Sequence, residues 1–133
     1  MTVLVVDANI MASALMGTTL PLLADQAARG IVLAAPQPQL EETRGVLHRR
    51  GTPDPDARMA ALLEIVEPLD PIAFETFEAK ARERLEAHGQ RDWPVLAAAM
   101  ALGGHIWSHD KDFLGVGVPV WSNRNVRHIE PAI

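Results

Sequence analysis

Cysteine is absent from this sequence of 133 residues. Its absence excludes disulfide bonds, thiolate metal sites and a cysteine nucleophile, and it suits a reducing compartment. The chain also lacks any apolar run near the roughly 18 residues that a membrane-spanning helix needs. It opens on an apolar segment that ends in an acid, without the basic region and cleavage motif of a signal peptide. These absences predict a cytoplasmic protein that has no membrane association.

The sequence has few positive charges, because its 17 acidic residues outnumber its 12 lysines and arginines and give a net charge of −5. A net negative charge argues against a nucleic-acid partner. Two features weaken that argument. Ten of the twelve basic residues are arginine, whose planar guanidinium suits phosphate. A metal bound among clustered acids would also offset their charge, so net charge does not decide the partner.

Apolar residues make up 48% of the chain and charged residues 22%, as in soluble globular proteins. The length suits one domain over residues 1–133. Apolar runs predict strands at 3–6, 31–35, 65–69, 105–108 and 118–121, and helical patterns predict helices at 10–16, 21–29, 38–50, 57–64, 73–88 and 93–102. This alternation predicts an α/β fold with a central, mostly parallel sheet and helices on both faces.

Four acidic residues stand where such a fold can bring them together. Asp7 ends the first predicted strand, and Asp110 follows the strand at 105–108. Asp92 begins the helix that leads into this strand, and Glu42 lies on the helix after the second strand. Ligands of open α/β sheets bind at the carboxyl ends of the strands, so the four side chains can meet at one edge.

Carboxylates gathered in one place raise one another's pKa, and a cation among them relieves their repulsion. A ligand set made only of oxygens selects Mg²⁺ or Mn²⁺. A metal-bound water becomes more acidic and can attack a phosphodiester, while the metal stabilises charge on the phosphate oxygens. The four acids therefore predict metal-dependent phosphodiester hydrolysis, for which no serine, histidine or cysteine nucleophile is needed.

Four segments, in order along the chain, resemble the PIN-domain nucleases. They are Val-Val-Asp-Ala-Asn-Ile at 5–10, Leu-Glu-Glu-Thr-Arg-Gly-Val-Leu at 40–47, Asp-Trp-Pro-Val-Leu-Ala-Ala-Ala at 92–99, and Ile-Trp-Ser-His-Asp-Lys-Asp-Phe at 106–113, followed by Val-Trp-Ser at 120–122. Each segment alone is weakly specific, whereas the ordered set spans nearly the whole chain. The resemblance implies a PIN-like three-layer α/β/α domain that cleaves RNA as an endoribonuclease with Mg²⁺ or Mn²⁺.

The resemblance also implies roles for the matching acids. Asp7, Asp92 and Asp110 resemble metal ligands, and Asp112 resembles an acid that some members add for a second metal or as support. Glu42 completes the catalytic set of Asp7, Glu42, Asp92 and Asp110. The adjacent residue, Glu41, is an alternative to Glu42, because the helical register rests only on the apolar residues that follow.

Other positions remain open between a functional and a structural role. Asn9 resembles a polar residue that orients water or ligand, but it could equally cap the helix after it. Asp92 could serve only as a helix cap. Arg44, Arg49 and Arg50 are candidates for contacting RNA phosphates, although such arginines more often form a solvated helix face. Position 109 departs from the family, because His109 stands where small or acidic residues are common.

The small size resembles VapC-like toxins of type II toxin–antitoxin systems, which implies a small antitoxin as inhibitor and a homodimer. Two alternatives within the fold are a nuclease that processes RNA without being a toxin, and a catalytically silent module that binds RNA or protein. A phosphoacceptor receiver domain also opens on an apolar strand ending in an acid. Receivers need an acidic pair there, which Ala8 and Asn9 do not supply.

Overall fold

The computed structural model describes residues 1–132. Its centre, within those residues, is a five-stranded sheet in the order β3-β2-β1-β4-β5, in which every neighbouring pair of strands is parallel. The strands are β1 (Val3–Val6), β2 (Val32–Pro36), β3 (Val66–Leu69), β4 (His105–Trp107) and β5 (Val120–Trp121). Each overlaps a predicted strand. The predicted parallel sheet is confirmed.

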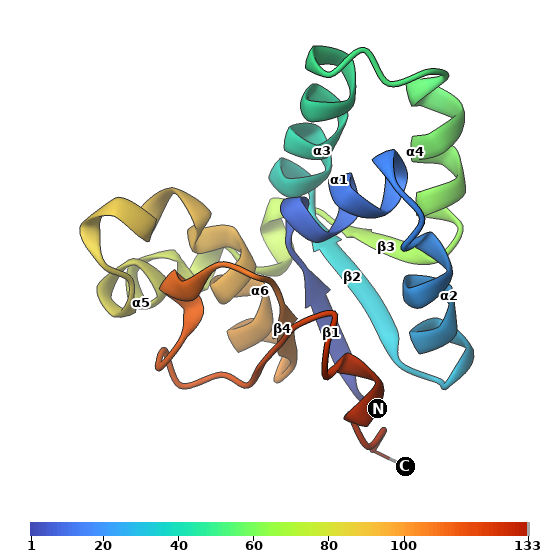
Figure 1. The fold of residues 1–133 in the computed structure, drawn as a ribbon. Coiled ribbons are helices and arrows are strands. Elements are labelled where there is room, and N and C mark those ends of the chain that lie inside the picture. The colour runs from blue at the N-terminus through green and yellow to red at the C-terminus, as the bar shows by residue number, and fades with distance from the viewer. Residues whose placement is uncertain (133) are drawn as a thin grey trace.

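Helices cover both faces of the sheet (Figure 1). Those described are α1 (Ala8–Met16), α2 (Leu20–Ala28), α3 (Gln37–Arg49), α4 (Pro55–Leu63), α5 (Glu78–Arg84) and α6 (Trp93–Leu102). Figure 1 shows α1 to α4 on one side of the strands and α5 and α6 on the other, which confirms the three-layer α/β/α arrangement. No helix within residues 1–132 has both the length and the apolar character to cross a membrane.

The central strand β1 is apolar along its whole length because both of its faces are covered. Successive side chains of a strand point to opposite faces. Leu4 and Val6 accordingly pack into the apolar cluster beneath α1 to α4, whereas Val5 packs into the cluster beneath α5 and α6. A continuous apolar run, rather than an alternating one, is what a strand buried on both faces requires.

The predicted helix at 73–88 is wrong in its extent. The chain instead forms short 3₁₀ helices, η1 (Pro71–Ala73), η2 (Glu75–Phe77) and η3 (Ala87–Asp92), and only α5 between them is α-helical. A continuous helix of this length would run straight for about 24 Å. Leu85 is instead extended (φ −98°, ψ 142°), and the chain turns so that Gly89 packs against Asp112. Tertiary packing overrides helix propensity here.

The order of the strands creates a topological switch point at the carboxyl edge of the sheet, between the ends of β1 and β4, the position where open α/β sheets have a crevice. The chain builds β2 and β3 on one side of β1, then crosses to place β4 and β5 on the other side. Segments that leave β1 and β4 therefore diverge, and ligands of open α/β sheets bind at such a switch point. Asp7 directly follows β1 and Ser108 directly follows β4, so polar residues meet at this crevice.

Candidate active site

Asp7 lies at the carboxyl end of β1 and is only 4% exposed. Ser108, at the end of the neighbouring strand, donates a hydrogen bond from Oγ to Asp7 Oδ2 (2.6 Å). Burial raises the pKa of Asp7 from 3.8 to about 6, against the lowering effect of the bonds from Ser108 and the Ala8 backbone. The negative charges of Asp92 and Asp110 also raise this pKa. Asp7 is thus a buried carboxylate beside two like charges.

Asp92 stands at the N-terminus of α6, but within the described chain its side chain accepts no capping hydrogen bond from that helix. The alternative that Asp92 is only a helix cap is therefore not supported. Burial raises the pKa of its carboxyl, and so do the charges of Glu42, Asp110 and Asp112, with Arg91 opposing them. Acids from four separate parts of the chain act on one another here.

Asp110 and Asp112 belong to the turn that follows β4, at the 3₁₀ helix η4 (Lys111–Phe113). The Asp112 N–H donates to Asp110 Oδ1 (2.9 Å), and the Asp110 N–H donates to Ser108 Oγ (2.9 Å). Ser108 therefore links Asp7 to Asp110. Asp112 Oδ1 accepts a hydrogen bond from His88 Nε2 (2.8 Å), which comes from η3.

The structure favours Glu42 over Glu41 as the acid of α3 that belongs to the site. Glu42 is half-buried, and its charge is the largest of those that raise the pKa of Asp92. Glu41 is exposed and lines a groove between α3 and α4 beside Arg44. Consecutive residues of a helix do not share a face, so only one of the two can point at the crevice.

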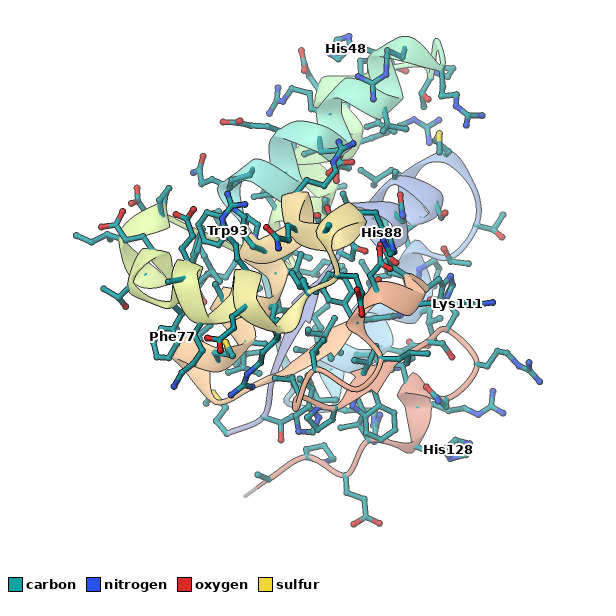
Figure 2. The ribbon with its side chains drawn as sticks, turned by 90° about the vertical axis from the view of Figure 1, so that its left-hand side faces the viewer. His48, Phe77, His88, Trp93, Lys111 and His128 are labelled. Carbon is teal, nitrogen blue, oxygen red and sulfur yellow. The ribbon has the colours of Figure 1, made fainter. Side chains whose placement is uncertain are left out.

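Within residues 1–132, no arginine forms an ion pair with any of the five acids, although the charge of Arg91 lowers the pKa of Asp92. The ion pairs of residues 1–132 are Arg44–Asp56, Arg82–Glu78 and His88–Asp112, and only the last includes an acid of the crevice. Figure 2 shows the labelled His88 in the body of the molecule, with the labelled His48 at the far end of α3. The acids therefore keep their mutual repulsion.

The three arginines proposed to contact RNA lie elsewhere. Arg44 Nη1 is 3.2 Å from Asp56 Oδ1, in an exposed pair that ties α3 to α4. Arg49 and Arg50 lie about 10 Å or more beyond Glu42 along α3, given the helical rise of about 1.5 Å per residue. The structure does not bring these three side chains to the acids.

Asn9 lies inside the first turn of α1, which begins at Ala8, so the alternative that it caps this helix is wrong. Its side chain is exposed at the edge where Asp7 lies. The start of α1 is held by Gln39 instead, because the Ala8 N–H donates to Gln39 Oε1 (3.0 Å). Gln39 is itself buried, and its carbonyl accepts a hydrogen bond from Thr43 Oγ1 (2.8 Å).

Sequence reasoning missed Ser108, Gln39 and His88. Ser108 left a usable signal, since it is a polar residue directly after a strand that lies beside β1. The other two left none, because neither directly follows a strand and their partners, 31 and 24 positions away, are reached only through side-chain packing between helices and loops.

The donor set fits a hard cation. The acids offer only oxygen atoms, which suits Mg²⁺ or Mn²⁺. Among residues 1–132, no group of three or more acidic or histidine side chains already has the arrangement of a metal cage. Mg²⁺ does not require one, since it usually binds through one or two carboxylates and keeps several waters. A cation beside Asp7 and Asp92 would offset both the burial and the repulsion that raise the pKa of each.

Known proteins share this fold. The sequence matches the family profile of the PIN domain over residues 5–129. Comparison with curated protein sequences gives no match. Among solved structures, the chain is similar to VapBC2 from Rickettsia felis bound to a DNA fragment from its promoter, with a TM-score of 0.73 and 14% identity over 91% of this chain and 98% of that one.

Two further structures are similar. One is a toxin–antitoxin complex from Klebsiella pneumoniae, with a TM-score of 0.65 and 17% identity over 90% of this chain and 96% of that one. The other is VapBC-1 from nontypeable Haemophilus influenzae, with a TM-score of 0.65 and 15% identity over 92% of this chain and 99% of that one. At such low identity, these likenesses concern the fold.

Proposed function

The chain belongs to the PIN domain family, and from that premise we propose that it is a metal-dependent endoribonuclease that hydrolyses RNA phosphodiester bonds. The observation that carries the proposal is the gathering of acids at the switch point of the sheet. The pKa of Asp7 and the pKa of Asp92 are both raised by burial and by neighbouring carboxylates. A site that concentrates unneutralised negative charge is suited to a dication.

Asp7, Asp92 and Asp110 would hold Mg²⁺ or Mn²⁺, with Asp112 beside them. The bound ion would supply an acidified water and stabilise charge on the phosphate. The protein's part is to fix the carboxylates. Ser108 orients Asp7 through the bond to its Oδ2 and also accepts the Asp110 N–H. Side chains around a metal ligand tune its orientation in this way.

RNA cleavage tests the proposal. Purified protein is incubated with single-stranded RNA and Mg²⁺ or Mn²⁺, and with chelator as the metal-free reference. We expect Asp7→Asn, Asp92→Asn and Glu42→Gln to lower the cleavage rate by about 100-fold or more, because outer-shell changes alone typically lower it 10- to 100-fold.

Glu41→Gln is the matched control, because it removes the same charge from the neighbouring residue on the exposed side of α3. It should cleave RNA at close to the wild-type rate. If wild-type protein leaves RNA intact with every metal, or if Asp7→Asn cleaves RNA as fast as wild type, the ribonuclease proposal is rejected.

We also propose that the chain is the toxin of a toxin–antitoxin pair, held inactive by a small protein whose basic side chain reaches the acids. The similar structures are described as VapBC and toxin–antitoxin assemblies, and the match covers at least 96% of each matching chain. Induced expression in bacteria should stop growth, and Asp7→Asn should not. If bacteria grow normally while they express wild-type protein, and this protein cleaves RNA in vitro, the toxin proposal is rejected and the ribonuclease proposal is retained.

A further inference from the structure

A cavity of about 260 Å³ adjoins the acids on the β5 side of the sheet. Ser108 and Asp110 form one end of it, and both belong to the acid cluster, since Ser108 donates to Asp7 and the charge of Asp110 acts on Asp7 and Asp92. The rest of the lining comes from residues in and next to η4, from β5 and from the turn after β5. A molecule in this cavity therefore lies directly against the site proposed to cut RNA.

Side chains from two loops fix the shape of this cavity. The Ser122 N–H donates to Asn125 Oδ1 (2.8 Å), which closes the turn after β5. The Asn123 N–H donates to His109 Nε2 (3.1 Å), which ties that turn to the loop after β4. His109, the residue that departs from the family pattern, thus has a defined role in joining the two loops. The cavity is formed before any ligand arrives.

The lining of the cavity combines apolar walls with polar groups. The apolar lining comes from Leu114, which is 65% exposed, and from the half-buried Val120 and Trp121. The Trp121 ring also stacks on His105 and donates from Nε1 to His105 Nδ1 (3.0 Å), which fixes its orientation. Lys111 supplies a positive charge. Proteins bind unpaired nucleotides with apolar or aromatic faces against the base and cations near the phosphate. The volume is below the roughly 300–1,000 Å³ of sites for drug-sized ligands, which suits a single nucleotide base.

We propose that this cavity binds the base of one RNA nucleotide next to the bond that is cut, and that Asn125 selects which base. The proposal rests on the proposed ribonuclease function. Asn125 Oδ1 is already occupied by the Ser122 N–H, so the amide nitrogen is the part of the side chain left for a ligand. That nitrogen donates hydrogen bonds. It favours guanine and uracil, which present a carbonyl oxygen, over adenine and cytosine, which present an amino donor at that place.

Nucleoside binding in chelator tests the proposal, since it needs neither metal nor cleavage and avoids repulsion between the acids and a phosphate. Tryptophan fluorescence is a suitable signal, because Trp121 lines the cavity, and Trp121→Phe identifies its contribution. We expect guanosine and uridine to bind about fivefold more tightly than adenosine and cytidine, as the net gain of one hydrogen bond implies. Equal binding of all four nucleosides, or no saturable binding, overturns the proposal.

Asn125→Asp is the sharpest variant. It keeps the oxygen that accepts the Ser122 N–H, so the turn is retained, but it replaces the free donor by an acceptor. The preference should move towards adenosine and cytidine. A preference that stays with guanosine and uridine shows that Asn125 does not select the base.

The two lysines of the chain provide a matched pair for the phosphate. Lys111→Gln should weaken the binding of nucleoside monophosphates about two- to fivefold, the range for an exposed ion pair, without changing nucleoside binding. Lys80→Gln removes the same charge from a different cavity, which includes His105 at the opposite end of β4. Lys80→Gln should change neither the binding of nucleoside monophosphates nor the binding of nucleosides. Equal weakening by both variants would mean that the phosphate responds to positive charge anywhere on the protein, and it would overturn the role of Lys111.

This test separates the cavity from the nuclease. Nucleosides that bind with the expected preference support the cavity, even if wild-type protein leaves RNA intact and the ribonuclease proposal fails. Cleavage of RNA by wild-type protein that binds no nucleoside supports the ribonuclease and overturns the cavity.

Discussion

At the scale of single residues, the charged carboxylate of Asp7 destabilises the folded chain in the absence of a cation. Burial is the largest cause of its raised pKa, and the hydrogen bonds from Ser108 and the Ala8 backbone offset only part of that effect. The residue is only 4% exposed, so water stabilises little of its negative charge. Residues that weaken a fold in this way are common at functional sites, where a ligand supplies the missing stabilisation.

The free energy of unfolding of the metal-free protein should therefore carry a pH-dependent contribution from Asp7. The folded pKa of about 6 exceeds the ordinary 3.8, so the folded state holds more protons than the unfolded state between these values. Stability then falls as pH rises from about 4 to about 6. Asp7→Asn should be more stable than wild type by up to about 3 kcal/mol at pH 7, and the difference should vanish near pH 4.

Urea unfolding of both proteins in chelator, from pH 4 to 8, measures this difference, because contributions from groups that do not interact with Asp7 cancel between them. Glu41→Gln serves as a charge control and should show a difference from wild type that is nearly independent of pH. A constant difference between wild type and Asp7→Asn across the range would show that Asp7 is not held at a raised pKa.

At the scale of elements, the strands and most helices could be predicted because their signals are local. The run at Val3–Val6 and the segment Trp93–Leu102 show this, since apolar residues fill both and the structure ends them where the sequence pattern ends. Residues 73–88 could not be predicted in the same way. Their helical pattern is genuine, but the chain turns at Leu85 to bring Gly89 against Asp112, a contact between segments distant in sequence.

Gly89→Ala should destabilise the protein, because an added Cβ would lie 3.0 Å from Asp112 Cβ and 2.9 Å from its Oδ2. The segment or the acid must then move, which typically lowers the free energy of unfolding by about 1–3 kcal/mol. Cleavage of RNA should fall as well, since Asp112 lies among the acids.

Gly45→Ala, measured in parallel by urea unfolding, is the matched control. Its added Cβ would meet only the flexible end of Arg49, and alanine is favoured over glycine within a helix by roughly 0.5–1 kcal/mol. It should leave stability unchanged or raised. Equal stability of Gly89→Ala and wild type would contradict the close packing of η3 on the turn after β4.

At the scale of the whole molecule, strand order explains why acids distant in sequence meet. Asp7, Asp92 and Asp110 could be predicted as neighbours, because each adjoins the end of a strand or the start of a helix that leads into one. The separation of Arg49 and Arg50 from the acids could also be predicted, because α3 directly follows β2 and so starts at the carboxyl edge of the sheet, with its last turn farthest away. The pairing of Arg44 with Asp56 could not, because it joins two helices through side chains alone.

The molecule carries a net charge of −5, and its acids concentrate part of that charge at one edge. RNA is itself a polyanion, so it approaches this edge against repulsion. A bound dication would offset part of this negative charge and give an RNA phosphate a cation to contact. The approach of RNA to this edge thus depends on the acids binding a metal.

The most direct measurement is therefore a titration with Mn²⁺, followed by the electron paramagnetic resonance signal of the free ion, in the absence of RNA. The account predicts saturable binding to wild type and to Glu41→Gln, and binding weakened by about tenfold or more in Asp7→Asn and Asp92→Asn. Binding of equal strength to all four proteins, or no saturable binding to wild type, would contradict the claim that these carboxylates form a metal centre.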